Sequence, residues 1–228
     1  MRLFASLVCG LSSAMALATA AQATAYTDES AWRAAVSNVF ALETWDTGAT
    51  PATSDVGAVA NLGIRFLPLN DGTLPTVQPY SFTGGVVRSG PNNLLNDRDN
   101  TLPGRGPINV VPLNAGDFLF GLGLWNVGGD DQLLLSFFDA NDVLIESVQS
   151  AISSGFFGIV NSSGAVRAEV NFVQGNGYAP TDDWQTAARG TFDPGGVPEP
   201  AVWAMMLIGF GAVGSLLRSA RRRSLVTA

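Results

Sequence analysis

The residues able to do chemistry in this 228-residue chain are almost all acidic. Histidine is absent, lysine is absent, and the single cysteine, Cys9, stands near the N-terminus. Without histidine the chain lacks the usual general base near neutral pH, the Ser-His-Asp arrangement and most zinc or copper sites. The side chains left for catalysis or metal binding are therefore carboxylates.

Four aspartates stand in two pairs that could hold a hard cation. Asp97 and Asp99 follow Asn96 closely, and Asp182 directly precedes Asp183. Calcium takes about six to eight oxygen ligands, and carboxylates supply them. The spacing is not that of an EF-hand loop, and aspartates at turns and strand ends explain the same pattern. A calcium site and ordinary turn aspartates both stay open.

Paired carboxylates can also hydrolyse a glycosidic bond when they lie about 5–10 Å apart. The sequence shows no pattern that places one carboxylate in an apolar pocket to tune its pKa. We therefore expect a protein without catalytic activity and without a required cofactor.

Aromatic residues suggest a different use, the stacking of sugar rings. Trp125, Trp184 and Tyr178 are the candidates, with asparagine and aspartate nearby for hydroxyl groups. Trp125 is the most interesting because it shares a predicted strand face with two glycines. Packing in a hydrophobic core is the alternative for each ring. A carbohydrate-binding surface module, with or without calcium, thus stands beside a structural role.

The charge of the middle of the chain restricts its partners. Residues 26–193 contain 7 arginines against 18 aspartates and glutamates, a net charge of −11. Such a surface attracts basic partners or divalent cations and repels nucleic acid. Nucleic-acid binding is therefore excluded.

The first 25 residues resemble a removable export signal. Arg2 precedes an uncharged apolar stretch, and small residues follow at Ala21, Ala23 and Ala25. These are the features of a secretory signal peptide. We predict a signal peptide over residues 1–25, cut after Ala23 or Ala25, and Cys9 leaves with it.

The last residues have three parts in a fixed order. Pro198-Glu199-Pro200 comes first, an uncharged apolar stretch over residues 201–217 follows, and the arginines Arg218, Arg221, Arg222 and Arg223 come last. The stretch is at the short end for a transmembrane helix. Arginines resist translocation and fix the end of the chain in the cytoplasm, and Trp203 suits the opposite membrane interface. The two prolines keep the segment before the helix extended.

These parts together resemble the PEP-CTERM sorting tail in its PEPxxWA form. The residues that carry the resemblance are Pro198, Glu199, Pro200, Trp203 and Ala204, followed by the arginines. The resemblance implies that an exosortase, a membrane-embedded enzyme of Gram-negative bacteria, recognises the tail and processes it close to the motif. It also implies export through the inner membrane, a membrane-anchored precursor, and a final place at the cell surface or in extracellular polysaccharide.

Residues 26–189 have the pattern of one β-rich domain. One helix is expected over residues 28–38, capped by Thr27, with Trp32 packed on a sheet. Period-two alternation then predicts strands, most clearly over residues 165–173 and 117–127. On the second, Leu119, Gly121, Gly123 and Trp125 share one face. Further strands are expected over residues 40–45, 62–67, 108–113, 132–138, 143–148, 156–160 and 184–188.

Many short strands at about ten-residue spacing indicate an antiparallel β-sandwich. Asp139 to Asp142 has the composition of a tight hairpin turn. The outline also resembles a jelly-roll-like ectodomain common among PEP-CTERM proteins. We expect an irregular region over residues 70–107, a flexible Gly/Pro stalk over residues 190–197 and the sorting tail over residues 198–228.

Overall fold

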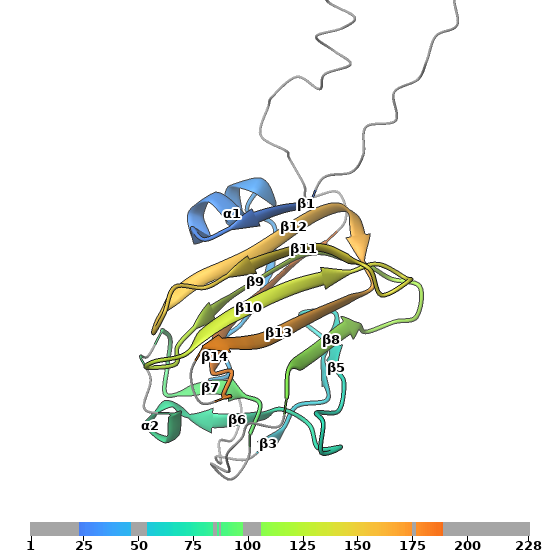
Figure 1. Cartoon of the computed structure of the whole chain (residues 1–228). Coiled ribbons are helices and arrows are strands. Elements are labelled where there is room, and N and C mark those ends of the chain that lie inside the picture. Colours follow the sequence, from blue (N-terminus) through green and yellow to red (C-terminus); the bar gives the residue numbers. More distant parts are fainter. Residues whose placement is uncertain are drawn as a thin grey trace, which may run out of the picture. The chain divides into compact units, whose positions relative to one another are not determined.

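Short strands with alternating burial form two sheets whose apolar faces meet. The computed structural model describes residues 23–46, 54–83, 86, 88–97, 106–174 and 177–188. In β10 (Gln132–Phe138) the side chains of Leu133, Leu135 and Phe137 are fully buried, whereas Gln132 is partly exposed. This alternation is what a strand requires when one face covers a core. The expected antiparallel β-sandwich with a short N-terminal helix is confirmed (Figure 1).

The first sheet has eight strands in the order β1-β12-β9-β14-β7-β6-β3, and β2 also pairs with β14. Among the described residues, its neighbouring strands pair antiparallel. The strands are β1 (Ala23–Tyr26), β2 (Ala41–Glu43), β3 (Ser54–Asp55), β6 (Thr76–Pro79), β7 (Asn92–Leu95), β9 (Leu119–Asn126), β12 (Gly155–Ala165) and β14 (Thr181–Ala187).

The second sheet has six strands in the order β11-β10-β13-β8-β5-β4. These strands are also paired antiparallel. Besides β10 they are β4 (Ala58–Val59), β5 (Ile64–Phe66), β8 (Ile108–Pro112), β11 (Leu144–Gln149) and β13 (Arg167–Gln174).

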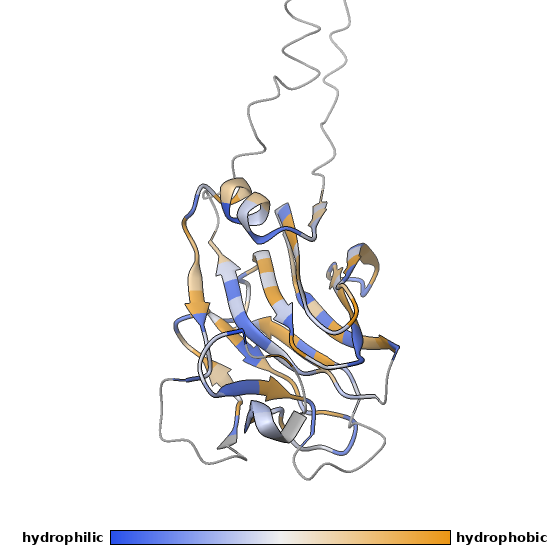
Figure 2. Ribbon diagram, turned by 90° about the vertical axis from the view of Figure 1, so that its left-hand side faces the viewer, coloured by the Kyte–Doolittle hydropathy of each residue, from blue (hydrophilic) through white to orange (hydrophobic). Residues whose placement is uncertain are grey.

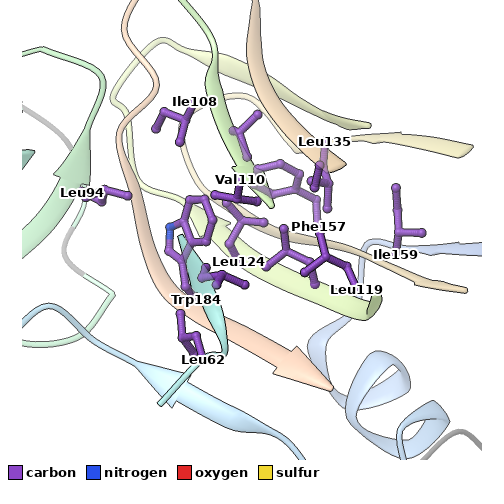
Figure 3. Packing of buried hydrophobic residues seen from close by; sticks show 14 of the residues in the cluster. Leu62, Leu94, Ile108, Val110, Leu119, Leu124, Leu135, Phe157, Ile159 and Trp184 are labelled. Carbon is purple, nitrogen blue, oxygen red and sulfur yellow. The ribbon is translucent and has the colours of Figure 1, made fainter. Parts of the chain in front are cut away.

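The hydrophobic core lies between the two sheets and draws on both. Leu124, Phe157 and Trp184 come from the first sheet, and Val110 and Leu135 from the second (Figure 3). Orange and blue alternate along several ribbons, as expected for strands with one face on a core (Figure 2). Burial of this apolar surface is the main favourable contribution to folding.

Helix α1 (Glu29–Ala35) begins one residue later than expected. Asp28 is its N-cap, with its carboxylate accepting a hydrogen bond of 2.8 Å from the amide of Ala31. The prediction of a cap at Thr27 and of a helix reaching residue 38 is wrong, because Asp28 supplies the acceptor and the helix ends at Ala35, with Val36 as its C-cap. Capping lowers the pKa of Asp28 through hydrogen bonds from Ser30 and Ala31.

Trp32 packs α1 on the outer face of the first sheet, beside Phe156, Val160 and Ala187 and over three glycines. Its side chain is fully buried, and its indole nitrogen donates to the carbonyl of Ile159 at 3.3 Å. A Cβ placed at Gly121, Gly123 or Gly158 would lie within 3.2 Å of this ring. The indole ring therefore lies directly on the backbone of β9 and β12 at Gly121, Gly123 and Gly158, which we call the glycine seat. The expected packing of Trp32 on a sheet is confirmed.

Strand β9 departs from the expected alternation at its start. Leu122 and Leu124 face the main core, and Gly121 and Gly123 face Trp32, as expected. Leu119, however, also belongs to the main core, whereas the two-residue period predicts it on the face of the glycines. The pairing with β12 shifts register just there, between Val160 and Ala165, and such an irregularity turns side chains.

Residues 70–107 are more ordered than expected. They contain β6 and β7, which pair with each other within the first sheet, and the one-turn helix α2 (Tyr80–Thr83). All four residues of β7 are buried. The prediction of one long irregular region is therefore wrong for residues 76–83 and 92–95.

The turn between β10 and β11 forms as expected. The carboxylate of Asp139 accepts hydrogen bonds from the amides of Asn141 and Val143, and Asp142 has φ 60°. Aspartate tolerates this left-handed conformation better than most residues. The same hydrogen bonds lower the pKa of Asp139.

Both predicted targeting segments lie largely outside the described residues. The signal peptide reaches them only at Ala23–Ala25, and the stalk and sorting tail over residues 190–228 do not reach them. Within the described part of the chain, no helix is both long and apolar enough to cross a membrane.

The glycine seat of Trp32 gives a first prediction. Gly158→Ala is expected to lower the free energy of unfolding by about 1–3 kcal/mol, because the added Cβ would lie 2.8 Å from Trp32 Cδ1 and 3.0 Å from Gly123 Cα. Gly57→Ala is the matched control, since its Cβ would make an ordinary contact of 3.5 Å with Leu74. Urea denaturation measures the stability of both variants, and equal stability of the two would contradict the prediction.

A second prediction concerns β1 and the site of signal cleavage. Cleavage after Ala23 keeps three of the four residues paired with β12, whereas cleavage after Ala25 leaves only Tyr26. A chain that begins at Thr24 should melt at least about 2 °C above one that begins at Tyr26, because the shorter chain loses ladder hydrogen bonds. Thermal unfolding compares the two chains, and identical melting temperatures would show that β1 adds nothing.

Candidate functional site

Charged and polar side chains from three segments of the chain, one of them α1, come together. Glu29 and Arg33 belong to α1, Arg88 and Ser89 precede β7, and Asp182, Asp183 and Gln185 belong to β14. We call these seven residues the Arg88 cluster.

Arg88 joins the two sides of the cluster. Its guanidinium lies 2.8 Å from Glu29 Oε2 and 3.4 Å from Asp183 Oδ2. Glu29 also pairs with Arg33 one helical turn later, at 2.7 Å, and accepts a hydrogen bond from Gln185 Nε2 at 2.6 Å. Both arginines are thus held by carboxylates of the same chain.

An irregularity in β14 brings two neighbouring aspartates to one partner. In a regular strand, Asp182 and Asp183 would point to opposite faces. Here the register with β9 shifts between Asp182 and Gln185, and Asp183 has φ 46°. As a result, Asp182 accepts a hydrogen bond of 3.0 Å from the amide of Ser89, and Asp183 accepts one from the Ser89 hydroxyl.

Burial makes Asp182 an unusual acid. It is almost inaccessible to solvent, and this desolvation raises the pKa of its carboxyl to about 7. Amide hydrogen bonds from Ser89 and Asp183 act against the rise, and the charges of Asp183 and Asp46 add to it. Burial also raises the pKa of Asp183, against the Ser89 hydroxyl and the charge of Arg88. Perturbed carboxyls of this kind are common at functional sites but also occur in structural networks.

The ring of Trp125 lies under the Arg88 cluster. Arg88 stacks over it with its guanidinium carbon 4.1 Å from the ring centroid, and Phe156 approaches it at 6.3 Å. The indole nitrogen is buried and has no hydrogen-bond partner in the part of the chain that the structure describes. Trp125 is partly exposed, but the ring face under Arg88 is not open for a sugar.

The other two aromatic candidates are buried. Trp184 is 0% exposed, packs against Trp45 and Phe66 in the main core, and donates to Thr181 Oγ1 at 2.9 Å. Tyr178 is 8% exposed, and burial and the charge of Asp97 raise its pKa. The prediction of Trp184 as a sugar-stacking residue is wrong because its ring has no free face, and Tyr178 offers little more.

The three calcium candidates that the structure describes, Asp97, Asp182 and Asp183, do not form one metal-binding group. Asp182 and Asp183 share Ser89, whereas Asp97 interacts with Tyr178. Asp99 lies outside the described residues. Within the described ranges, no group of three or more histidine, cysteine, aspartate or glutamate side chains has an arrangement that could hold a metal ion.

The predicted sorting and topology residues lie in the C-terminal part of the chain that the structure does not describe. Pro198, Glu199, Pro200, Trp203 and Ala204, with Arg218, Arg221, Arg222 and Arg223, all lie outside the described residues.

A groove lies at the end of β14, where Thr186, Ala187 and Ala188 form part of its wall. Its volume is about 470 Å³. Two further walls come from residues 39–41 and 117–121, and residues 60–63 complete it. Asp117 is the one carboxylate among the described residues that line it, and neither Asp182 nor Asp183 takes part.

The sequence pointed to Asp182 and Asp183 but missed their partners. Arg88 and Ser89 are 93 or more residues away from Asp182 in the chain and lie in the region expected to be irregular. Glu29 and Arg33 show only the i,i+4 spacing of a helical ion pair, which is common on exposed helices. No local signal joins these residues; only the sheet topology does.

Comparisons with known proteins leave the function open. No protein-family model matches the chain, and no curated protein matches it. Among solved structures, it is similar to the enzymatically active domain of tailspike protein 4 of bacteriophage CBA120, with 16% identity and a TM-score of 0.29. The match covers 67% of this chain and 19% of the tailspike chain. A likeness of this size bears on neither fold nor activity.

Chemically, the cluster can hold a proton near neutral pH and fasten a loop. Arg88 is occupied by Glu29, Asp183 and the Trp125 ring, so its charge is already neutralised within the chain. Ser89 is held by both aspartates. The arrangement therefore ties Arg88 to α1 and β14, and Ser89 to β14.

The raised pKa of Asp182 predicts that stability depends on pH. Above about pH 7 this carboxyl is ionised in both the folded and the unfolded protein, and the folded state bears the cost of the buried charge. Between about pH 7 and pH 4 the folded state binds a proton that the unfolded state does not, so the free energy of unfolding rises as pH falls, by up to about 1.4 kcal/mol per unit.

Asp182→Asn should flatten this pH dependence between pH 8 and pH 5. The control is Asp130→Asn, which changes an exposed aspartate and should leave the slope in place. Urea denaturation at several pH values measures the slope. A steep slope that persists in Asp182→Asn would show that another group takes up the proton.

Proposed function

We propose that this chain is an exported cell-surface or exopolysaccharide-matrix protein with a non-catalytic, structural role, sorted and processed through its C-terminal motif by an exosortase. One observation carries the proposal, namely the order of Pro198-Glu199-Pro200, Trp203-Ala204, the apolar residues up to 217 and the terminal arginines. A lone Pro-Glu-Pro would carry no weight.

Physical chemistry supports a role for each part of this tail. Two prolines keep residues 198–200 extended and unable to continue a helix, which is the state that a processing enzyme needs in its substrate. The apolar residues 201–217 hold the motif at the membrane, and the arginines keep the chain end in the cytoplasm. The N-terminal residues 1–25 bring the chain to that membrane as a signal peptide.

The properties of the folded domain are compatible with a structural role. The charged groups of the Arg88 cluster are engaged with one another, and Trp184 and Tyr178 are buried. Carbohydrate binding, the alternative, would need an exposed aromatic ring on which a sugar can stack. Trp184 and Tyr178 do not offer one, and Arg88 covers one face of Trp125. An acidic surface of net charge −11 favours solubility outside the cell and interaction with basic partners or divalent cations.

The proposal predicts that the tail is lost in the presence of an exosortase. Mass spectrometry of the C-terminus of the full chain should show removal of Arg221 to Arg223 when an exosortase is co-expressed, and retention when it is not. Replacing Pro198, Glu199 and Pro200 together by alanine should block removal because the recognised segment is gone.

The matched control is Pro194→Ala, which removes a proline a few residues before the motif and should leave processing intact. An intact arginine tail in the unaltered chain, with and without the exosortase, would refute the proposed sorting. Processing of the triple variant at the normal rate would refute the role of the motif.

A further inference from the structure

The groove at the end of β14 lies in line with that strand, where the sheet would continue if β14 were longer. β14 lies between β9 and β2 and is paired with both. Thr186 is opposite Leu122 on one side and Ala41 on the other, and Ala187 is opposite Gly121. Beyond Ala187 the two neighbouring segments go on, as residues 117–120 and 39–40, and they are the walls of the groove.

The groove is thus a space between two segments where a further stretch of β14 would lie. If the antiparallel register of Ala187 with Gly121 continues, Ala188 falls opposite Phe120, residue 189 opposite Leu119 and residue 190 opposite Phe118. On the other side residues 188 and 187 meet Val39 and Phe40. A segment added here would pair its backbone with existing strands, as in strand addition at a sheet edge.

The walls are apolar and partly open to solvent. Val39 is 56% exposed and Phe118 is 47% exposed, although both are large hydrophobic residues. Exposed apolar residues that gather along a groove mark a binding surface more often than scattered ones do. Asp117, the single acidic residue in the part of the lining that the structure describes, stands at one end of the β9 wall.

We propose that residues 189–192 of this chain, Arg-Gly-Thr-Phe, occupy the groove as a continuation of β14. Chain continuity favours this occupant, because Ala188 is already part of the wall and the next residues start from that point. Four extended residues reach about 13 Å, enough to bring Phe192 along the groove. Tethering also gives this segment a higher effective concentration than a second copy of the chain has.

The residue types of the segment suit these walls. Phe192 is the one large apolar residue between Ala188 and Val197. Gly190 would stand opposite the bulky Phe118, and Arg189, opposite Leu119, would be diagonal to Asp117. Diagonal neighbours on paired strands lie within reach of long side chains. The inference concerns the folded domain alone and does not depend on the proposed sorting.

Trypsin tests the proposal, because Arg189–Gly190 is a cleavable bond. In the full chain this bond should resist trypsin, and Phe192→Ser should raise its cleavage rate by at least about 10-fold because the apolar anchor is lost. The matched control, Asp193→Ser, introduces the same residue at the next position and should leave the rate unchanged. Rapid cleavage of the unaltered chain, or no effect of Phe192→Ser, would overturn the proposal.

Disulfide trapping tests the register and the occupant. In the full chain carrying Cys9→Ser, the pair Phe118→Cys with Gly190→Cys should form an intramolecular disulfide under mild oxidation. The control pair, Phe118→Cys with Gly195→Cys, shares the tether but not the register, and should form it at least about 10-fold more slowly. Equal rates for the two pairs, or a disulfide-linked dimer in place of the internal bond, would overturn the proposal.

Discussion

The packing of Trp32 on the glycine seat is the constraint that positions α1 on the outer face of the first sheet. An indole can approach the backbone of two adjacent strands only where no Cβ intervenes, and Gly123 and Gly158 face each other in the register of β9 with β12. The seat fixes the position of α1. It also fixes Glu29 and Arg33, because the same seven-residue helix carries them. The packing of Trp32 on the sheet therefore positions two of the charged residues of the Arg88 cluster, Glu29 and Arg33.

Two buried asparagines, Asn96 and Asn126, are held by hydrogen bonds to the backbone of loops. Asn96 donates to the carbonyls of Gly106 and Gly177 and accepts from the amide of Ala179. Asn126 bonds the carbonyls of Asp131 and Ala151. A buried amide is tolerated when its hydrogen bonds are satisfied, and these two side chains satisfy loop backbone in return. Asp182 is the costlier case, since it is a carboxyl whose charge is buried beside other acids.

Much of the fold could be predicted because its strands obey a two-residue period. The expected stretches near β5, β8, β10, β11, β12, β13 and β14 are all strands, and the Asp139 turn joins β10 to β11. The sequence pattern did not predict β6 and β7, because polar residues and proline are not typical of a buried strand. These residues are Gln78, Pro79, Asn92 and Asn93, and the burial of the three polar ones depends on partners elsewhere in the chain. The candidate site was half visible, since Asp182 and Asp183 are adjacent in sequence. Arg88 joins them only through the topology of the first sheet.

The two ends of the described domain leave it on the same side. Thr24 pairs with Val160, Val160 with Gly121, and Gly121 with Ala187, so the first and last strands of the chain meet one row of the sheet. Trp125, Phe156 and Asp182 form another row, four residues further along β12 or about 13 Å away. A support that holds the domain at either end therefore lies nearer to the row of Ala187 than to the row of Trp125 and Asp182, and leaves the ring under Arg88 at a distance from the attachment.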